Sequence, residues 1–215
     1  MAGDSEGQKK RGIWSRPGPR WLLGIPLGGF LAFGLGMLAL GAANYTIHAT
    51  SSNEFCLSCH SHEANIRAEY EASSHFSNTS GVRAQCADCH LPKDNWFELT
   101  WTKAVVSLDV IPEFTGKLST PEKYEAHRAE MAESVWRQFR DNDSKFCRSC
   151  HSFGAMDFAQ QERRTARRHA RAEEEGQTCV QCHYGLVHKE PDGAQEILEA
   201  VFAPAKAAVA QADAN

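Results

Sequence analysis

Eight cysteines constrain this 215-residue chain more than any other feature, because every one of them belongs to a C-x-x-C pair followed directly by histidine. C-x-x-C-H is the attachment motif of c-type haem, in which both sulfurs hold the porphyrin and the histidine binds its iron. The pattern therefore predicts four covalently bound haem c groups. The four motifs are Cys56, Cys59 and His60; Cys86, Cys89 and His90; Cys147, Cys150 and His151; and Cys179, Cys182 and His183.

Two other uses of paired cysteines fit the pattern less well. Structural zinc sites use C-x-x-C pairs, but they do not require a histidine directly after every pair. Disulfides within C-x-x-C would close very small loops, which restrain the unfolded chain little. Haem attachment accounts for all twelve residues at once.

The amino-terminal region has the pattern of a membrane anchor. Residues 1–20 are polar and carry five basic side chains, whereas residues 21–43 contain no charge. A helix over this uncharged stretch would be roughly 34 Å long, enough to cross a hydrocarbon core of about 30 Å. A cleaved signal peptide is the alternative, because small residues occupy positions 41–43.

The basic residues before the span predict its orientation in the membrane. Positive charge stays on the cytoplasmic side, so we expect residues 1–20 in the cytoplasm and residues from 44 onward on the opposite side, where c-type haem is found. Glycines at helical spacing along the span allow close approach of a second helix in a homodimer; the alternative is that glycine is simply common in membrane helices.

Beyond the membrane, the chain is acidic and predicted to be mainly α-helical. Of 27 acidic and 23 basic residues, two acidic and five basic ones precede position 44, which leaves 25 against 18. This charge argues against a nucleic-acid partner. We expect one transmembrane helix followed by a small helical and loop multihaem domain over residues 44–190, with a fraying tail over 191–215.

Two helices are predicted in the region beyond the membrane. Residues 119–144 begin with a Ser/Thr cap and Pro121, and they read as a connecting helix. Residues 157–175 read as a second helix, whose run of five arginines favours a solvated face over a docking site.

An internal duplication supplies candidates for the second ligand of each iron. The halves cover about residues 50–95 and 141–190; His75 lies between the first two motifs and His169 between the last two. Lys93 and His188 follow the second and fourth motifs, but removing the lysine proton at pH 7 costs about 4.6 kcal/mol, so Lys93 is interpreted as a surface charge. The pseudo-symmetry predicts that His75 serves the fourth haem, His169 the second and His188 the third.

Several segments resemble the NapC/NirT family of membrane-anchored tetrahaem cytochromes c. They are "GVRAQCADCHLPK", "PEKYEAHRAEMAE", "CRSCHSFGAMDF" and "GQTCVQCHYGLVHK", and the resemblance covers residues 20–190. It implies oxidation of membrane quinol, either menaquinol or ubiquinol, and transfer of electrons to a periplasmic nitrate or nitrite reductase in anaerobic respiration. Two alternatives stay open: an electron-transfer anchor without a quinone site, and the same protein working in reverse as a quinone reductase.

The resemblance raises a question about the first motif. Relatives have methionine two residues after the motif histidine, and in some members this methionine binds the first iron, whereas this chain has His62. His60 is favoured as the iron ligand, with His62 packing nearby; the other assignment gives the iron to His62. Imidazole in place of the thioether is expected to lower the potential of this haem.

The quinol site is expected after the second motif. In relatives a lysine and an acidic residue there contact quinol, and Lys103 and Asp109 match them approximately, with Glu98 as an alternative. The plainer interpretation is a helix face lying on lipid or haem, formed by Trp96, Phe97, Trp101, Val105 and Val106, with Lys103 extending to the membrane surface.

Overall fold

A computed structural model describes residues 27–203, and this part of the chain is helical, with no β-strand. The mainly α fold expected from the sequence is therefore confirmed. The predicted cytoplasmic segment, residues 21–26 of the span and the end of the tail lie outside the described residues. The chain divides into a first unit that ends at Ala49 and a second that begins at Thr50.

The first unit contains one helix, α1 (Leu27–Ala49). Residues 28–49 have a mean hydropathy of 1.5 and are long enough to cross a membrane. The helix continues six residues past the predicted end at position 43. Large apolar side chains such as Phe33 and Leu38 are exposed along it, as expected for a helix whose surroundings are lipid.

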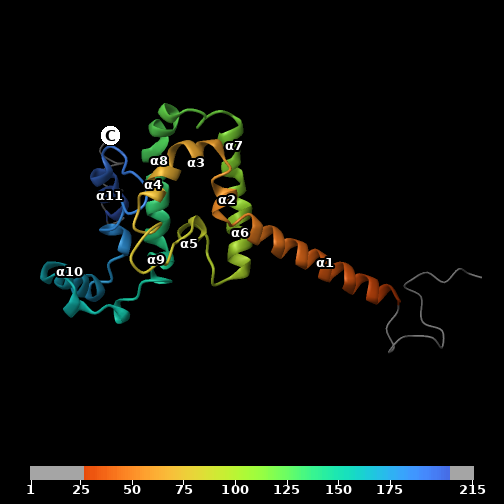
Figure 1. The fold of residues 1–215 in the computed structure, drawn as a ribbon, viewed down its shortest axis with the longest axis horizontal. Helices are drawn as coiled ribbons and strands as arrows, with labels where there is room; N and C mark the ends of the chain where they lie inside the picture. The colour runs from red at the N-terminus through yellow and green to blue at the C-terminus, as the bar shows by residue number, and fades with distance from the viewer. Residues whose placement is uncertain (1–26, 204–215) are drawn as a thin grey trace, which may run out of the picture. The chain divides into compact units, whose positions relative to one another are not determined.

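The second unit contains the remaining helices (Figure 1). The α-helices are α2 (Asn53–Cys56), α3 (His60–Asn65), α4 (Arg67–Glu71), α5 (Cys86–His90), α6 (Trp96–Val106), α7 (Val110–Phe114), α8 (Pro121–Asp141), α9 (Lys145–Arg148), α10 (Arg163–Glu174) and α11 (Ala194–Phe202). Short 3₁₀ turns are η1 (Ser107–Asp109), η2 (Phe153–Ala155), η3 (Phe158–Gln160) and η4 (Cys179–Gln181).

The predicted connecting helix is α8, and its start follows the expected cap. The Thr120 hydroxyl accepts from the Lys123 amide at 3.3 Å, and Pro121 occupies the first turn, where it needs no backbone donor. A cap of this kind stabilises a helix by about 1 kcal/mol. The second predicted helix is α10, which is shorter than expected because η3 occupies the start of that stretch.

The prediction of a fraying carboxy-terminal tail is wrong for residues 194–202. These residues form α11, which packs along α8 and η4. Leu198 and Val201 are one helical turn apart and buried against Trp136, with Val201 fully enclosed. Burying such side chains is worth about 1.5–3 kcal/mol each, which explains why an alanine-rich segment is held.

The side-chain core is small for a unit of this size, as expected if porphyrin supplies part of the interior. The cluster around Trp136 and Val201 lies where α8, η4 and α11 meet. Each cysteine motif contains or adjoins a buried apolar side chain, and these are Leu57, Ala87, Phe146 and Val180. The two halves of the duplication belong to one compact unit, because α5 contacts α9.

Candidate haem centres

The four motifs lie in one continuous row through the second unit. The Cys56 and Cys86 thiols are within hydrogen-bonding reach of each other, which joins the first motif to the second. The α5–α9 contact joins the second to the third. The thiols of Cys147 and Cys179 then meet in the same way and join the third to the fourth. The first cysteines of each half are therefore paired alike, as the internal duplication predicts.

Three pairs of histidine rings face each other across the second unit. The ring centroids of His90 and His188 are 6.3 Å apart, those of His75 and His151 are 6.3 Å apart, and those of His169 and His183 are 6.0 Å apart. Metal–nitrogen bonds to imidazole are about 2 Å long, so two rings on opposite sides of one iron have centroids roughly 6 Å apart. The residues present therefore fit three haems with a histidine on each side.

These pairs differ from the ones expected from pseudo-symmetry, which are wrong for the structure. His188 stands against the second motif, His75 against the third and His169 against the fourth. His75 belongs to the first half and faces the third motif, in the second half. His188 belongs to the second half and faces the second motif, in the first half. The halves thus exchange these two histidines, whereas His169 faces the fourth motif within its own half.

Three of the paired histidines, His90, His183 and His188, have lowered pKa values, which favours the neutral form that binds iron. The ring edge of His90 is accessible, yet the protein around it desolvates the imidazole, and together with His188 and His62 this lowers its pKa to about 4. Burial likewise lowers the pKa of His183 and of His188.

One of the rings, that of His169, is oriented by a hydrogen bond through its Nδ1 atom, and the ring of His188 lies near a carboxylate. His169 Nδ1 donates to Gln161 Oε1 at 2.8 Å, which leaves Nε2 with its lone pair directed toward His183 and its motif. His188 Nδ1 lies 3.5 Å from Glu69 Oε2. Glu69 is itself fixed by the nearly buried Arg128, whose Nη2 lies 2.7 Å from Glu69 Oε1, and by the Lys189 amide at 3.0 Å.

The first motif has a different backbone from the others. In the third and fourth motifs the histidine amide donates to the carbonyl of the first cysteine, at 2.8 Å for His151 and 2.9 Å for His183, and the second motif is the helical turn α5. In the first motif, Cys59 is extended (φ −73°, ψ 134°) and interrupts this turn. The Cys56 carbonyl instead accepts from His62 Nδ1 at 2.7 Å.

Neither His60 nor His62 has a facing histidine ring among residues 27–203. The hydrogen bond from Nδ1 fixes the His62 tautomer, so its Nε2 carries a free lone pair. The backbone amides of His60 and Ser61 donate to Glu113, with Ser61 N at 3.1 Å from Glu113 Oε1.

Lys103 lies beside the first motif. Its Nζ donates to the carbonyl oxygen of Thr50 at 2.9 Å and to the Thr50 hydroxyl at 2.8 Å. Desolvation lowers the pKa of Lys103, and the nearby Cys56 opposes this effect. Since Thr50 follows α1 directly in the chain, this contact ties the middle of α6 to the residue that leaves the predicted membrane span.

The acidic group against the first motif is Glu113, which sequence reasoning missed. Hydrogen bonds from the Ser61 side chain and from the backbone of Ser61 and His60 hold the pKa of Glu113 below its usual range. The predicted Asp109 is exposed in η1 and makes no hydrogen bond or ion pair within the described part of the chain. The alternative Glu98 pairs with Lys145 at 2.8 Å, and Lys93 pairs with Asp88 as a surface charge.

An exposed apolar face runs along α6, η1 and α7. It includes every residue of the predicted lipid-facing or haem-facing set and continues through α7. Its exposed side chains are Trp96, Phe97, Trp101, Val105, Val106, Leu108, Val110, Ile111 and Phe114. Exposed large apolar side chains in this number mark an interaction site.

Comparison with known proteins gives the same interpretation. Residues 22–193 match the model of the NapC/NirT cytochrome c family, N-terminal region. The chain belongs to this family. It is 48% identical to cytochrome c-type protein TorY of Haemophilus influenzae over 74% of the chain and 43% of that protein. It is 39% identical to cytochrome c-type protein NapC of Escherichia coli K12, over 83% of the chain and 88% of NapC.

Two further members extend the comparison. The chain is 37% identical to the denitrification system component NirT of Stutzerimonas stutzeri, over 90% of the chain and 96% of NirT. It is 45% identical, over 75% of the chain, to a protein of Allochromatium vinosum whose name describes a tetraheme cytochrome-c type. The chain spans less than half the length of the TorY proteins that it matches. No solved structure matches.

Membership in the NapC/NirT family makes this protein a c-type cytochrome with covalently bound haem c and a role in electron transfer. Together with α1, it also indicates a membrane-anchored protein. The histidine ring pairs described above fit such a cytochrome.

Proposed function

We propose that this cytochrome oxidises membrane quinol, menaquinol or ubiquinol, at its first haem and passes the electrons to a soluble periplasmic reductase of the nitrate or nitrite type. The observation that carries the proposal is the exceptional first motif. It stands beside Lys103, which is bound to the residue directly after the span, and it lacks a facing histidine ring among the described residues. The other three motifs have such a ring and serve for electron transfer alone.

In this proposal each histidine pair holds one of the last three haems, and the eight cysteines attach all four. His62 holds the first iron, because its Nδ1 is engaged by the Cys56 carbonyl while the helical turn that would orient His60 is interrupted at Cys59. Bound haem supplies reversible one-electron chemistry. The chain's task is to hold four such groups in a row, which the thiol pairs and the α5–α9 contact support.

Quinol oxidation releases two electrons and two protons, so the site also needs proton acceptors. Glu113 is ionised at neutral pH and lies near Cys59 and His62, where its carboxylate can accept a hydrogen bond from a quinol hydroxyl. Lys103 orients the ring from the other side, near Cys56. Asp109, exposed on η1, remains a predicted quinol contact.

The apolar face of α6 and α7 supports a site at the membrane surface. Lys103 ties α6 to Thr50, so this face lies where lipid ends, and its tryptophans suit the interface between lipid and water. We infer that the amino terminus is cytoplasmic, and that the haem domain is in the periplasm of a bacterial inner membrane.

The full-length holoprotein in lipid nanodiscs tests the proposal. We expect a reduced menaquinol analogue to reduce the haems, followed by their α-band absorbance, and a quinol-site inhibitor to abolish the reaction. Dithionite serves as the control, because it reduces the haems without a quinol site. If dithionite reduces all four haems while neither a menaquinol nor a ubiquinol analogue reduces any, the protein is an electron-transfer anchor instead.

A further inference from the structure

Helix α10 carries five arginines on one face. At 100° per residue, positions 163, 167, 171, 164 and 168 fall within an arc of about 140°. All five side chains are exposed, and they are Arg163, Arg164, Arg167, Arg168 and Arg171. We call this surface the arginine face.

The arginine face is largely unpaired. Arg171 contacts Glu175 at 2.7 Å, but within residues 27–203 the other four arginines make no ion pair or hydrogen bond through their side chains. Arginines elsewhere in the same unit are neutralised, for example Arg67 by Glu63 and Arg137 by Glu133. Positive charge is thus concentrated on α10, in a region where acidic residues outnumber basic ones.

The opposite side of α10 belongs to the fourth motif. His169 lies about 170° around the helix from the centre of the arginine face, and its ring packs among Phe153, Phe158 and His183. The same inner side contributes Ala172 to a cavity of about 420 Å³ that His151 and Phe153 also line. One helix therefore holds the last iron ligand on one side and presents positive charge to solvent on the other.

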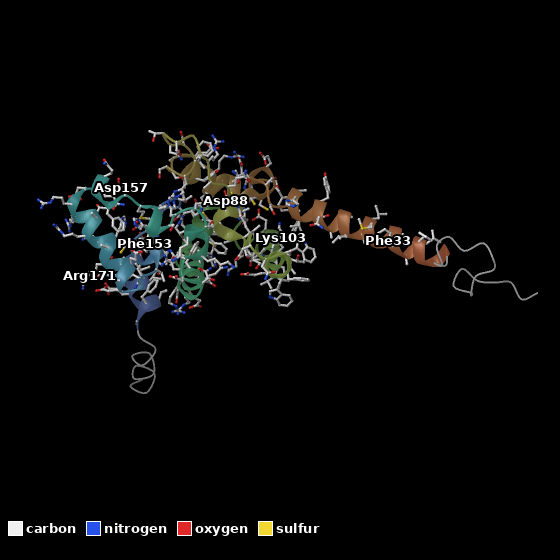
Figure 2. The ribbon with its side chains drawn as sticks, turned by 90° about the horizontal axis from the view of Figure 1, so that it is seen from below. Phe33, Asp88, Lys103, Phe153, Asp157 and Arg171 are labelled. Carbon is white, nitrogen blue, oxygen red and sulfur yellow. The ribbon has the colours of Figure 1, made fainter. Side chains whose placement is uncertain are left out.

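The arginine face is also remote from the quinol end of the haem unit. In Figure 2, Asp157, Phe153 and Arg171 lie together at one end of the second unit, Lys103 lies at the other, and Asp88 lies between them. Figure 1 likewise shows α10 far from α2 and α6.

We propose that the arginine face is the docking surface for the soluble electron acceptor, and that the acceptor presents an acidic surface around its own redox centre. This inference rests on the proposed function, because it assigns the exit of the same electron path. The fourth haem is the last in the row, so a partner held on α10 receives one electron at a time from it, and the acceptor is reduced as the haem is oxidised. Complementary charge speeds such encounters without requiring tight binding.

Electron transfer between the full-length holoprotein and two purified acceptors tests this inference. The protein in neutral-lipid nanodiscs is reduced with dithionite, freed of excess reductant and mixed in a stopped-flow instrument with an oxidised acidic or basic monohaem cytochrome c. We expect faster transfer to the acidic acceptor. Its rate constant should fall about tenfold or more as ionic strength rises from about 0.01 M to about 0.15 M, because screening shortens from about 30 Å to about 8 Å.

In the variant R164E/R168E, the low-salt rate constant for transfer to the acidic acceptor should be about tenfold lower than in the wild type. The rate constant for transfer to the basic acceptor should be unchanged or higher. The rate constant of R164Q/R168Q with the acidic acceptor should lie between those of R164E/R168E and the wild type. The matched control K117E/R137E makes the same change in net charge at exposed side chains away from α10 and should lose less than twofold. The mass of each chain should show four haems.

Three results would overturn the inference. An unchanged rate constant in R164E/R168E would mean that the acceptor does not dock on the arginine face. An equal loss in K117E/R137E would mean that the effect comes from net charge and not from this surface. An equal loss with both acceptors would indicate a damaged haem centre. Arginine-dependent binding to phosphatidylglycerol vesicles, with electron transfer unaffected, would assign the face to anionic lipid. Because dithionite supplies the electrons, failure of the quinol reaction does not affect this test.

Discussion

The first and third motifs are counterparts in the internal duplication, yet they hold their histidines differently. Both bring their first cysteine against the first cysteine of the next motif. In the third, His151 completes a helical turn onto Cys147 and faces His75. In the first, the turn is interrupted, and His62 occupies the carbonyl that His60 would otherwise use. The sulfur framework is thus kept in both halves, and the iron ligands differ at the motif beside the membrane.

This difference separates two tasks that one cofactor performs. An iron with a protein ligand on both sides has no position for substrate and needs little rearrangement as electrons pass. An iron without a second histidine can lie next to a reactant. Variants that remove or exchange ligands therefore test whether the two kinds of motif do different work.

The largest effect is expected from breaking a complete pair. H188L removes the ring that faces His90, so the second haem should become high-spin, and turnover from quinol to acceptor should fall at least about 100-fold. Absorption spectra report the spin state, and stopped-flow kinetics report transfer. H127L is the control, since the exposed His127 bonds only to the Lys123 carbonyl at 2.8 Å within α8. A low-spin second haem in H188L would show that His188 does not bind the second iron opposite His90.

Exchanging the two histidines of the first motif sharpens the comparison directly. H62M should raise the potential of the first haem, on the order of 100 mV, because thioether favours ferrous iron more than imidazole does. H60M should leave that potential within about 20 mV of the wild type, if His60 does not bind the iron. Potentiometric titration followed by electron paramagnetic resonance measures both. If H60M raises the potential and H62M does not, His60 is the iron ligand.

Much of this arrangement could be predicted from local patterns, because they depend on neighbours in the chain. The cap at Thr120 and Pro121 predicted the start of α8. The surface role of Lys93 followed from the cost of removing its proton, and the structure pairs Lys93 with Asp88.

Contacts distant in sequence could not be predicted in this way. Which ring faces His90 depends on how the segment carrying His188 packs beside α8, and pseudo-symmetry gave the wrong partner. Glu113 reaches Ser61 across 52 positions, with no spacing rule to indicate it. The segment that forms α11 looked like a tail because its buried residues, Ala194, Leu198 and Val201, are significant only once Trp136 is beside them.

A smaller effect is expected at the membrane side of the first motif. K103L removes the amine that contacts Thr50, so quinol oxidation should fall about tenfold while all four haems remain attached. The measurements are quinol-dependent haem reduction and the mass of the chain. K117L removes an exposed lysine that pairs only with Glu130 at 3.7 Å, and it should be silent. Unchanged turnover in K103L would exclude it from the quinol site.

The smallest effect concerns the surroundings of a complete pair. Glu69 places a negative charge 3.5 Å from His188 Nδ1, and a nearby anion favours the ferric state. E69Q should therefore raise the potential of the second haem by about 30–60 mV, since 59 mV corresponds to a tenfold change for one electron. E125Q is the matched control, because Glu125 also pairs with Arg128, at 2.8 Å, but has no contact with His188 within the described residues.

The two variants also separate tuning of the haem from loss of stability. Both deprive the nearly buried Arg128 of one carboxylate, which should cost about 1–3 kcal/mol of unfolding free energy in either case. Only E69Q should move the potential of the second haem. Equal shifts of potential in both variants would mean that Arg128 and its surrounding charge act on the haem as a whole. In that case Glu69 would have no special role, and orientation of the ring would depend on packing alone.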